Sequence, residues 1–311
     1  MAHFVEHMAF NGTTHFRKHE LVSYLETIGV QFGADLNAYT SFDETVYILP
    51  IPTANRDHVD KGFMVLSDWA QGLSFNGKDI DQERPVVLEE LRLGKGAKDR
   101  MQKVLLPKLF NGSRYAERLP IGQEAIIKSG SHAALKRFYH DWYRPNLMAL
   151  VVVGDIEPQE AERLIKRHFA ALKNPARPRA RFETAIAPRS ATEALVVTDK
   201  EANGNGLMVR YPVKPAVEET TLGGYRAMLV RNLFSTMLNL RLQELGQQAN
   251  PPFLGASSDI GRLTSHYESY NLSARPGQRR RGPGDQCADR RERAPASSAS
   301  ARPNSIAPAR T

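Results

Sequence analysis

The pentapeptide His3-Phe4-Val5-Glu6-His7 carries the strongest signal in this sequence. On a helix, residues four apart lie on one face about 6 Å apart, so the imidazoles of His3 and His7 can converge on one zinc ion. Glu6 lies on the flank of that pair, where a general base can take a proton from a metal-bound water. The alternative is an ordinary helix with two histidines. With nine histidines in the chain, a chance match to this pattern is roughly a one-in-a-hundred event, which favours the metal site.

A catalytic zinc ion also needs a third protein ligand and an open position for water. Residues 81–91, DQERPVVLEEL, have the pattern of an acidic amphipathic helix with Pro85 in its first turn. Glu83 and Glu90 would lie within about 20° of each other around such a helix, whereas Glu89 points about 100° away from Glu90. We therefore expect Glu90 to be the third ligand and Glu89 to be a solvated charge. Taken alone, the segment is more typical of an ordinary acidic helix without a metal, and the histidine motif is what favours the ligand.

His15 and His19 have the same helical spacing and provide a comparison. They flank Phe16, Arg17 and Lys18, and the two cations would repel a zinc ion and offer no base. We expect neither histidine to be a ligand.

Helical and extended patterns alternate along the rest of the chain, which predicts an α+β fold. Apolar residues at helical spacing predict helices over residues 19–28, 56–71, 79–93, 132–142, 158–172 and 221–245. Extended patterns predict strands over residues 34–40, 44–49, 147–153, 194–198, 207–211 and 266–273. The apolar run 147–153 is expected to be a buried strand.

The composition predicts three regions. A Pro- and Arg-rich linker over residues 174–181 separates a first domain, residues 1–185, which contains the expected zinc ligands, from part of a second α+β domain, residues 190–274. Residues 275–311 have no Leu, Val, Phe, Tyr or Trp and are rich in Arg, Pro, Ala and Ser. Such a segment cannot bury enough apolar area to offset its ordering entropy, so we expect a disordered tail.

The net charge of +8 comes mainly from that tail, which has nine arginines against three acidic residues. We expect no nucleic-acid partner, because the tail has no aromatic side chain to stack on bases. A basic nucleic-acid arm is the alternative. The single cysteine, Cys287, excludes an internal disulfide. No apolar run is long enough for a membrane span.

Residues 3–13, HFVEHMAFNGT, resemble the inverted zinc motif H-x-x-E-H of the pitrilysin/insulinase (M16) family, and are closest to its bacterial members. The resemblance implies an M16-type domain, with a mainly antiparallel sheet packed against helices, followed by part of a second similar domain. It also implies a zinc-dependent metalloendopeptidase that hydrolyses short or unfolded polypeptides. The family's zinc ligands correspond to His3, His7 and Glu90, its general base to Glu6, and a second glutamate that supports catalysis to Glu83.

Residues 37–41, NAYTS, resemble the edge strand along which the substrates of that family lie. The resemblance places Asn37, Ala38 and Tyr39 against the bound peptide, whose backbone would add to the sheet as an extra strand. Residues 138–155 resemble a joint between a helix and a strand of the same domain, and we expect them to be structural.

The resemblance covers residues 2–273. Members of the family have strands ahead of the zinc helix and a C-terminal half-molecule, so we expect a chain truncated at both ends that could pair with a second M16 half-molecule or subunit. The alternative is a catalytically silent homologue that acts as a structural or interaction subunit. An exposed sheet edge predicts poor solubility. The compartment stays open, because the chain shows no signal peptide whereas bacterial relatives of this type are often periplasmic.

Overall fold

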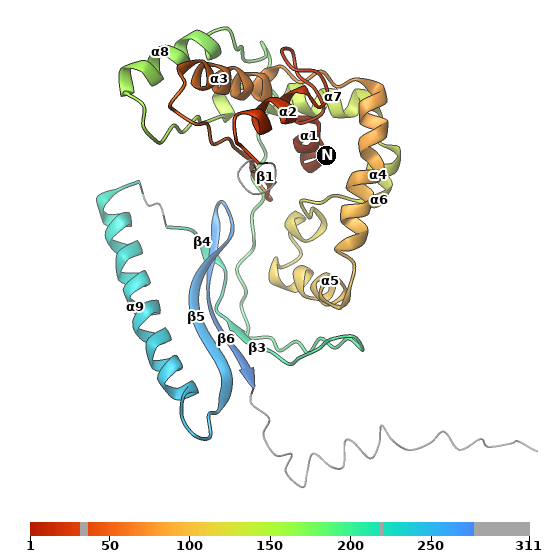
Figure 1. Cartoon of the computed structure of the whole chain (residues 1–311). Helices are drawn as coiled ribbons and strands as arrows, with labels where there is room; N and C mark the ends of the chain where they lie inside the picture. The colour runs from red at the N-terminus through yellow and green to blue at the C-terminus, as the bar shows by residue number, and fades with distance from the viewer. Residues whose placement is uncertain (32–36, 218–219, 277–311) are drawn as a thin grey trace, which may run out of the picture.

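The computed structural model describes residues 1–31, 37–217 and 220–276. Helices surround a short hairpin in the first part of the chain, and a sheet with one long helix follows (Figure 1). The helices are α1 (Ala2–Met8), α2 (Glu20–Thr27), α3 (Arg56–Gln71), α4 (Gly77–Leu93), α5 (Ala97–Leu109), α6 (Glu124–Ser129), α7 (His132–Trp142), α8 (Pro158–Phe169) and α9 (Leu222–Gly246). The 3-10 turns are η1 (Arg114–Glu117) and η2 (Pro145–Leu147). The strands are β1 (Asn37–Thr40), β2 (Thr45–Ile48), β3 (Leu207–Arg210), β4 (Lys214–Pro215), β5 (Phe253–Thr264) and β6 (Tyr267–Pro276). The predicted α+β class is confirmed, and the strand pairs within the described residues are antiparallel.

The short helix α1 depends on its neighbours for stability. Its seven residues are too few for a stable helix in water, and no side chain caps its N-terminus. Phe4 and Val5 are buried in one cluster with Val87 of α4 and Leu135 of α7. This packing sets α1 beside the helix that carries Glu90.

A second apolar cluster anchors the end of α1 to α3. The ring of Trp69 packs with Leu21 and Leu25 of α2, and its Nε1 donates to the carbonyl of Ala9 at 3.0 Å. Asn55 caps α3 by accepting a hydrogen bond from a backbone N–H of the first turn. The segment that contains His3 and His7 is therefore held between α3 on one side and α4 on the other.

Strands β1 and β2 form a hairpin that contacts α1. Thr40 pairs with Thr45 next to the turn, and the backbone N–H of Ser41 donates to the carbonyl of Glu44 at 2.8 Å. Within the described part of the chain, β1 has no strand on its other edge. The first residues of the predicted strand 34–40, up to residue 36, lie outside the described residues.

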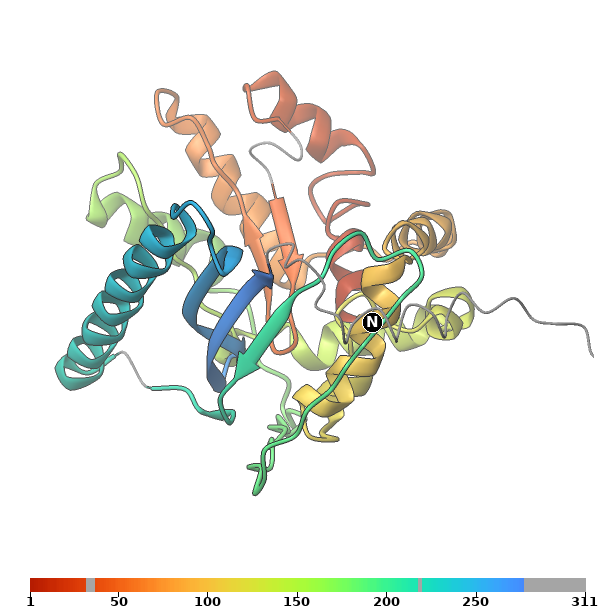
Figure 2. The same cartoon turned by 90° about the horizontal axis from the view of Figure 1, so that it is seen from below.

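The second sheet is built on β6, which pairs with β5 along its length and with β3 and β4 over shorter stretches. Helix α9 lies alongside β5, as Figure 2 shows from below. Asn239 of α9 exchanges two hydrogen bonds with the backbone of Ser258, at 2.7 and 2.9 Å. Arg231 of α9 also contacts the buried carboxylate of Glu268 at 2.6 Å.

Two predicted strands are wrong. Residues 147–153 begin in η2 and continue as an unpaired segment, in which Val151 is 80% exposed and Val153 is 90% exposed. Residues 194–198 are unpaired as well. A strand needs a hydrogen-bonded neighbour, and no described segment supplies one at either place. Apolar composition is therefore not sufficient to predict a strand there.

The predicted helices 56–71 and 132–142 have the bounds of α3 and α7, and the remaining predicted helices and strands overlap with observed ones but have shifted ends. Helix α4 begins at Gly77, with Asn76 as its cap, so Pro85 lies in the helix interior rather than in the first turn as expected. Proline there removes one helical hydrogen bond. Helix α8 ends at Phe169, three residues before the predicted end at residue 172. β5 is not among the predicted elements, because its sequence, FLGASSDIGRLT, lacks apolar alternation.

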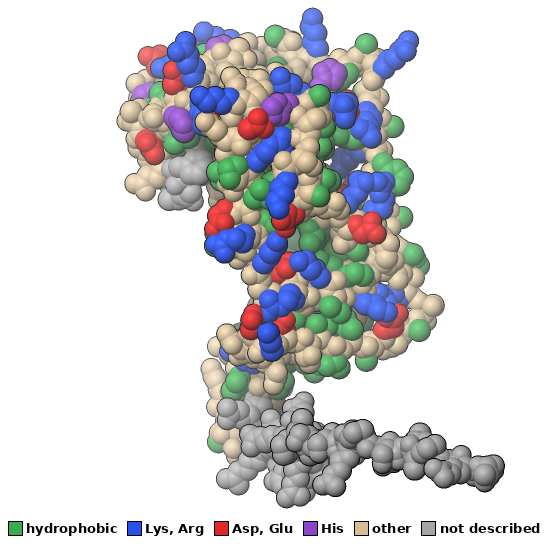
Figure 3. Space-filling view, turned by 90° about the vertical axis from the view of Figure 1, so that its right-hand side faces the viewer, with side chains coloured by type: hydrophobic (Ala, Val, Ile, Leu, Met, Phe, Trp, Pro, Cys, Tyr) green, Lys and Arg blue, Asp and Glu red, His purple; other side chains and the backbone are tan. Residues whose placement is uncertain are grey.

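The division into residues 1–185 and 190–274 stays a prediction. The predicted tail 275–311 lies outside the described residues, except that residues 275 and 276 end β6. On the face in Figure 3, Lys and Arg side chains are interspersed with Asp and Glu side chains, so that this face is mixed in charge. Among the described residues, no helix is both long and apolar enough to span a membrane.

Candidate metal centre

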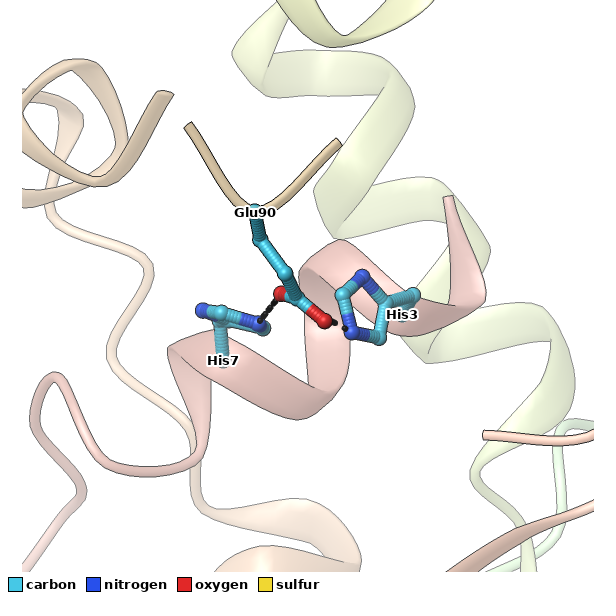
Figure 4. Close-up of side chains that lie close together, drawn as sticks. All are labelled: His3, His7 and Glu90. Carbon is cyan, nitrogen blue, oxygen red and sulfur yellow. Dashed lines mark ion pairs between the residues drawn. The ribbon is translucent and has the colours of Figure 1, made fainter. Parts of the chain in front are cut away.

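His3, His7 and Glu90 come together in space, as the sequence predicts. The two imidazoles project from the same side of α1 toward the carboxylate of Glu90 on α4 (Figure 4). Glu90 Oε2 lies 3.5 Å from His3 Nε2 and 3.3 Å from His7 Nε2. One ligand atom from each side chain lies within 4.8 Å of the other two, and in the described part of the chain this is the group that could hold a metal ion.

These distances suit a metal site better than a hydrogen-bonded cluster. Direct N–H···O bonds are mostly about 2.9–3.0 Å long. Zinc holds nitrogen and oxygen ligands at about 2.0–2.2 Å, so two ligand atoms at a tetrahedral zinc lie roughly 3.3–3.5 Å apart. The spacings of 3.5 and 3.3 Å from Glu90 to the two imidazoles match that value. Two imidazoles and one carboxylate are also a donor set that zinc accepts.

A hydrogen bond on the far side of the ring orients His7. His7 Nδ1 donates to Glu83 Oε1 at 2.9 Å, which leaves the lone pair of Nε2 facing Glu90. Histidine ligands usually donate their second nitrogen to a carboxylate in this way. Glu83 therefore lies where the sequence predicts a supporting glutamate, but its contact is with His7 Nδ1 and not with the group of three ligand atoms.

Asn11 forms hydrogen bonds with both Glu83 and His7. Its Nδ2 donates to Glu83 Oε2 at 2.8 Å and to the carbonyl of His7 at 3.1 Å, and the residue is almost fully buried. Asn11 is not among the predicted site residues. Its position four residues after His7, in the otherwise apolar stretch after the motif, is the signal that could have identified it.

Glu6 is a buried carboxylate next to the metal-ligand group. It is 7% exposed, and the hydroxyl of Thr40 on β1 donates to its Oε2 at 2.5 Å. Burial raises the pKa of Glu6, and the negative charge of Glu90 acts in the same direction, while the Thr40 hydrogen bond and His7 oppose the rise. A carboxylate with a raised pKa is suited to take up a proton.

The pKa values of the two histidines move in opposite directions. Burial lowers the pKa of His3, and its Nδ1 is buried with no hydrogen-bond partner in the described residues. Burial also lowers the pKa of His7, but the hydrogen bond and charge of Glu83, together with the charge of Glu90, outweigh burial and raise it. Burial raises the pKa of Glu83, but the hydrogen bonds from His7 and Asn11 outweigh that and lower it.

The predicted substrate residues lie on β1, close to Glu6. Asn37 and Tyr39 are exposed and Ala38 is partly exposed. The same strand ends at Thr40, which contacts Glu6, and its edge opposite β2 has no strand partner in the described residues. An extended peptide could therefore pair with β1 beside the predicted base.

The residues expected to lie outside the site do so. His15 Nδ1 contacts the buried carboxylate of Asp68 at 2.8 Å. His19 precedes α2 with a positive φ of 69°. Glu89 is exposed and pairs with Arg92 at 2.6 Å.

Comparison with known proteins gives the family. The model of the insulinase family, peptidase family M16, matches residues 1–119, and the model of the peptidase M16 inactive domain matches residues 131–261. The zinc protease PQQL-like of Arabidopsis thaliana is 34% identical over 276 residues, which are 88% of this chain and 29% of that protein. The probable zinc protease PqqL of Escherichia coli (strain K12) is 36% identical over 281 residues, 88% of this chain and 30% of that protein.

The solved structures agree. The first half of the periplasmic protease PqqL from Escherichia coli aligns with a TM-score of 0.78 and 31% identity, over 89% of this chain and 59% of that one. Pitrilysin, at 18% identity and a TM-score of 0.63 over 93% of this chain and 30% of that one, shares the fold. The chain spans about 30% of the length of the curated relatives named above. Because two M16 models together match most of its length, the chain belongs to the peptidase M16, or insulinase, family.

Proposed function

We propose that this chain hydrolyses peptide bonds of short or unfolded polypeptides as a zinc-dependent metalloendopeptidase. The observation that carries the proposal is the convergence of His3, His7 and Glu90 with the buried carboxylate of Glu6 beside them. The names of the relatives as zinc proteases support it at the level of the family.

Each residue has a defined role in this proposal. A zinc ion held by His3, His7 and Glu90 would polarise the scissile carbonyl and lower the pKa of a bound water to about 7. Glu6 takes the proton of the attacking water and delivers it to the leaving amine. Glu83 keeps His7 in the tautomer that leaves Nε2 free.

Substrate binding is assigned to the free edge of β1. A peptide that pairs with this edge gains backbone hydrogen bonds that do not depend on its sequence. That edge consists of Asn37, Ala38 and Tyr39, and the next residue, Thr40, contacts Glu6. A peptide bound there has to be extended, which favours short or unfolded polypeptides over folded proteins.

The setting of the whole protein is part of the proposal. The relative from Escherichia coli is described as a periplasmic protease, and we assign the periplasm to this chain as well. The chain matches about 30% of such relatives in length. We therefore expect a second M16 half-molecule or subunit to pair with this chain.

The competing function is a silent subunit that serves assembly. The observation in its favour is the apolar outer side of α9, where Leu233 and Met237 are more than 60% exposed. Exposed apolar surface of this kind is typical of an interface. The intact set of ligands and base argues for the peptidase, because a silent protein has no need to keep it.

Zinc content and peptide cleavage, measured together, test the proposal. We expect the chain to bind one zinc ion and to cleave a quenched fluorescent peptide, and Glu6→Gln to keep the zinc but lose cleavage by about 10²-fold or more. Glu89→Gln is the matched control, because Glu89 is exposed and pairs with Arg92 outside the site. Zinc binding without cleavage in any variant would favour the silent subunit. A chain that binds no zinc would contradict the peptidase.

A further inference from the structure

The β1–β2 hairpin, on which the proposed substrate edge lies, needs support from outside. Each strand has four residues, and the sheet contains these two strands within the described part of the chain. A two-stranded hairpin of this size is marginally stable in water. The position of β1 beside Glu6 must therefore be fixed by contacts with other elements.

Asp43, at the tip of the hairpin, makes such contacts. The hydroxyl of Tyr115, in η1, donates to both carboxylate oxygens of Asp43, at 3.0 and 3.1 Å. The backbone N–H of Ser265, in the turn between β5 and β6, donates to Asp43 Oδ2 at 3.3 Å. Burial raises the pKa of Tyr115 to about 12, so that its hydroxyl keeps the proton that it donates. Asp43 thus joins three segments that are far apart in the sequence.

An aromatic cluster reinforces the same junction. The ring of Phe42 lies 5.2 Å from that of Phe110 and 5.4 Å from that of Tyr115, in edge-to-face geometry. Phe110 and Tyr115 are buried, and Leu263 and Tyr267, on either side of the β5–β6 turn, pack against them. The tip of the hairpin therefore packs against an apolar cluster through Phe42, and the adjacent Asp43 accepts hydrogen bonds from Tyr115 and Ser265.

The junction lies close to the predicted base. Thr40, which donates to Glu6, is three residues before Asp43, and the Ser41–Glu44 hydrogen bond ties the turn together between them. A shift of the turn would therefore move the Thr40 hydroxyl and the free edge of β1 relative to Glu6.

We propose that Asp43 is a positioning residue of the peptidase site: by binding Tyr115 and the β5–β6 turn, it holds the edge of β1 and the hydroxyl of Thr40 against Glu6. This inference rests on the proposed function. The proposed ligands and base all come from residues 3–90. Through Ser265, the second predicted domain, residues 190–274, would help to hold β1 in place beside them.

Hydrogen exchange tests the anchor without using catalysis. In Asp43→Asn, which keeps the size of the side chain but removes its charge, we expect the backbone amides of residues 37–48 to exchange about tenfold faster than in the parent chain. Glu44→Gln is the matched control, because it is the next residue, undergoes the same change of charge and is exposed. Unchanged exchange in Asp43→Asn, or equal acceleration in both variants, would overturn the anchor.

Kinetics of the zinc-loaded chain test the positioning role. We expect Asp43→Asn and Tyr115→Phe each to raise KM for the peptide about tenfold with zinc content unchanged. The double variant should be no worse than either single one, because both changes break the same contact. Faster exchange with unaltered kinetics would refute the positioning role.

If the parent chain does not cleave peptides, the proposed function fails. Peptide affinity, measured by fluorescence anisotropy, then replaces KM, and equal affinity in the parent chain and Asp43→Asn would again refute it.

Discussion

At the residue scale, Asn11 supports the candidate metal centre through Glu83. The side-chain amide of Asn11 donates a hydrogen bond to Glu83 Oε2, and Glu83 in turn orients His7. Removing the amide would leave one oxygen of a largely buried carboxylate without this partner, which costs more than losing an exposed hydrogen bond. Glu83 would then be free to turn away from His7 Nδ1.

We therefore predict that Asn11→Ala weakens zinc binding by about 10- to 100-fold, the usual effect of losing a group that supports a metal ligand. Competition with a chelator of known zinc affinity measures this change. Asn203→Ala is the control, since Asn203 is exposed and distant in sequence from the site. Equal zinc affinities in the two variants would show that Glu83 keeps its place without Asn11.

The raised pKa of His7 predicts how zinc binding depends on pH. A histidine ligand must be neutral, so zinc displaces the proton from His7 wherever the pH is below the raised pKa of that group, which exceeds its ordinary value of 6.5. Affinity should accordingly fall about tenfold per unit as pH decreases through that pKa. The pKa of His3 is lowered by burial, so His3 contributes less than His7 to this pH dependence. Dissociation constants measured from about pH 6 to about pH 8 check the slope, and a flat profile would contradict it.

The residues that come together as candidate metal ligands could be predicted from the sequence, whereas Asn11 and Thr40 could not. A spacing of four residues places His3 and His7 on one helix face, and a spacing of seven places Glu83 and Glu90 on one face of another. That these two faces meet was implied by the family resemblance. The contacts of Asn11 with Glu83 and of Thr40 with Glu6 join positions 72 and 34 residues apart in the sequence. Local periodicity contains no information about such pairs.

At the scale of elements, the packing of α1 on α4 determines whether the ligands meet. Val87 of α4 has no exposed area and shares a cluster with Val5, whereas its neighbour Val86 is 50% exposed. We predict that Val87→Ala lowers the free energy of unfolding of the metal-free chain by about 1.5–3 kcal/mol. It should also weaken zinc binding, because Glu83 and Glu90 are on the same helix.

Val86→Ala is the matched control for this prediction and should change stability by less than about 0.5 kcal/mol. Urea denaturation of the two variants gives the difference directly. A similar loss in both would mean that α4 is not held to α1 through Val87.

Helices were easier to predict than strands in this chain, and the reason is physical. A helix makes its hydrogen bonds within itself, so α3, α4 and α7 follow from local pattern and caps. A strand exists only if another segment pairs with it. The apolar run 147–153 has no such partner among the described residues, whereas β5, with its many small and polar residues, pairs with β6 along its length.

At the scale of the whole molecule, α9 packs against the sheet on one side and exposes apolar side chains on the other. One side of the helix contacts the sheet through Arg231 and Asn239. The other carries apolar side chains that are more than half exposed and recur three and four residues apart, namely Val230, Leu233, Met237 and Leu240. This is the spacing of a helix-pairing stripe. Contiguous apolar surface of this kind favours association over a dispersed monomer.

We predict that the chain self-associates as its concentration rises, and that Leu233→Lys combined with Met237→Lys shifts it toward the monomer, because two charges in the stripe oppose its burial. Sedimentation velocity over a range of concentrations measures the distribution. Leu93→Lys combined with Val104→Lys is the control, since these residues are exposed but lie on α4 and α5. A monomer at high concentration would contradict the prediction. An equal response in both double variants would place the source of association elsewhere, for example at the unpaired segment that contains Val151 and Val153.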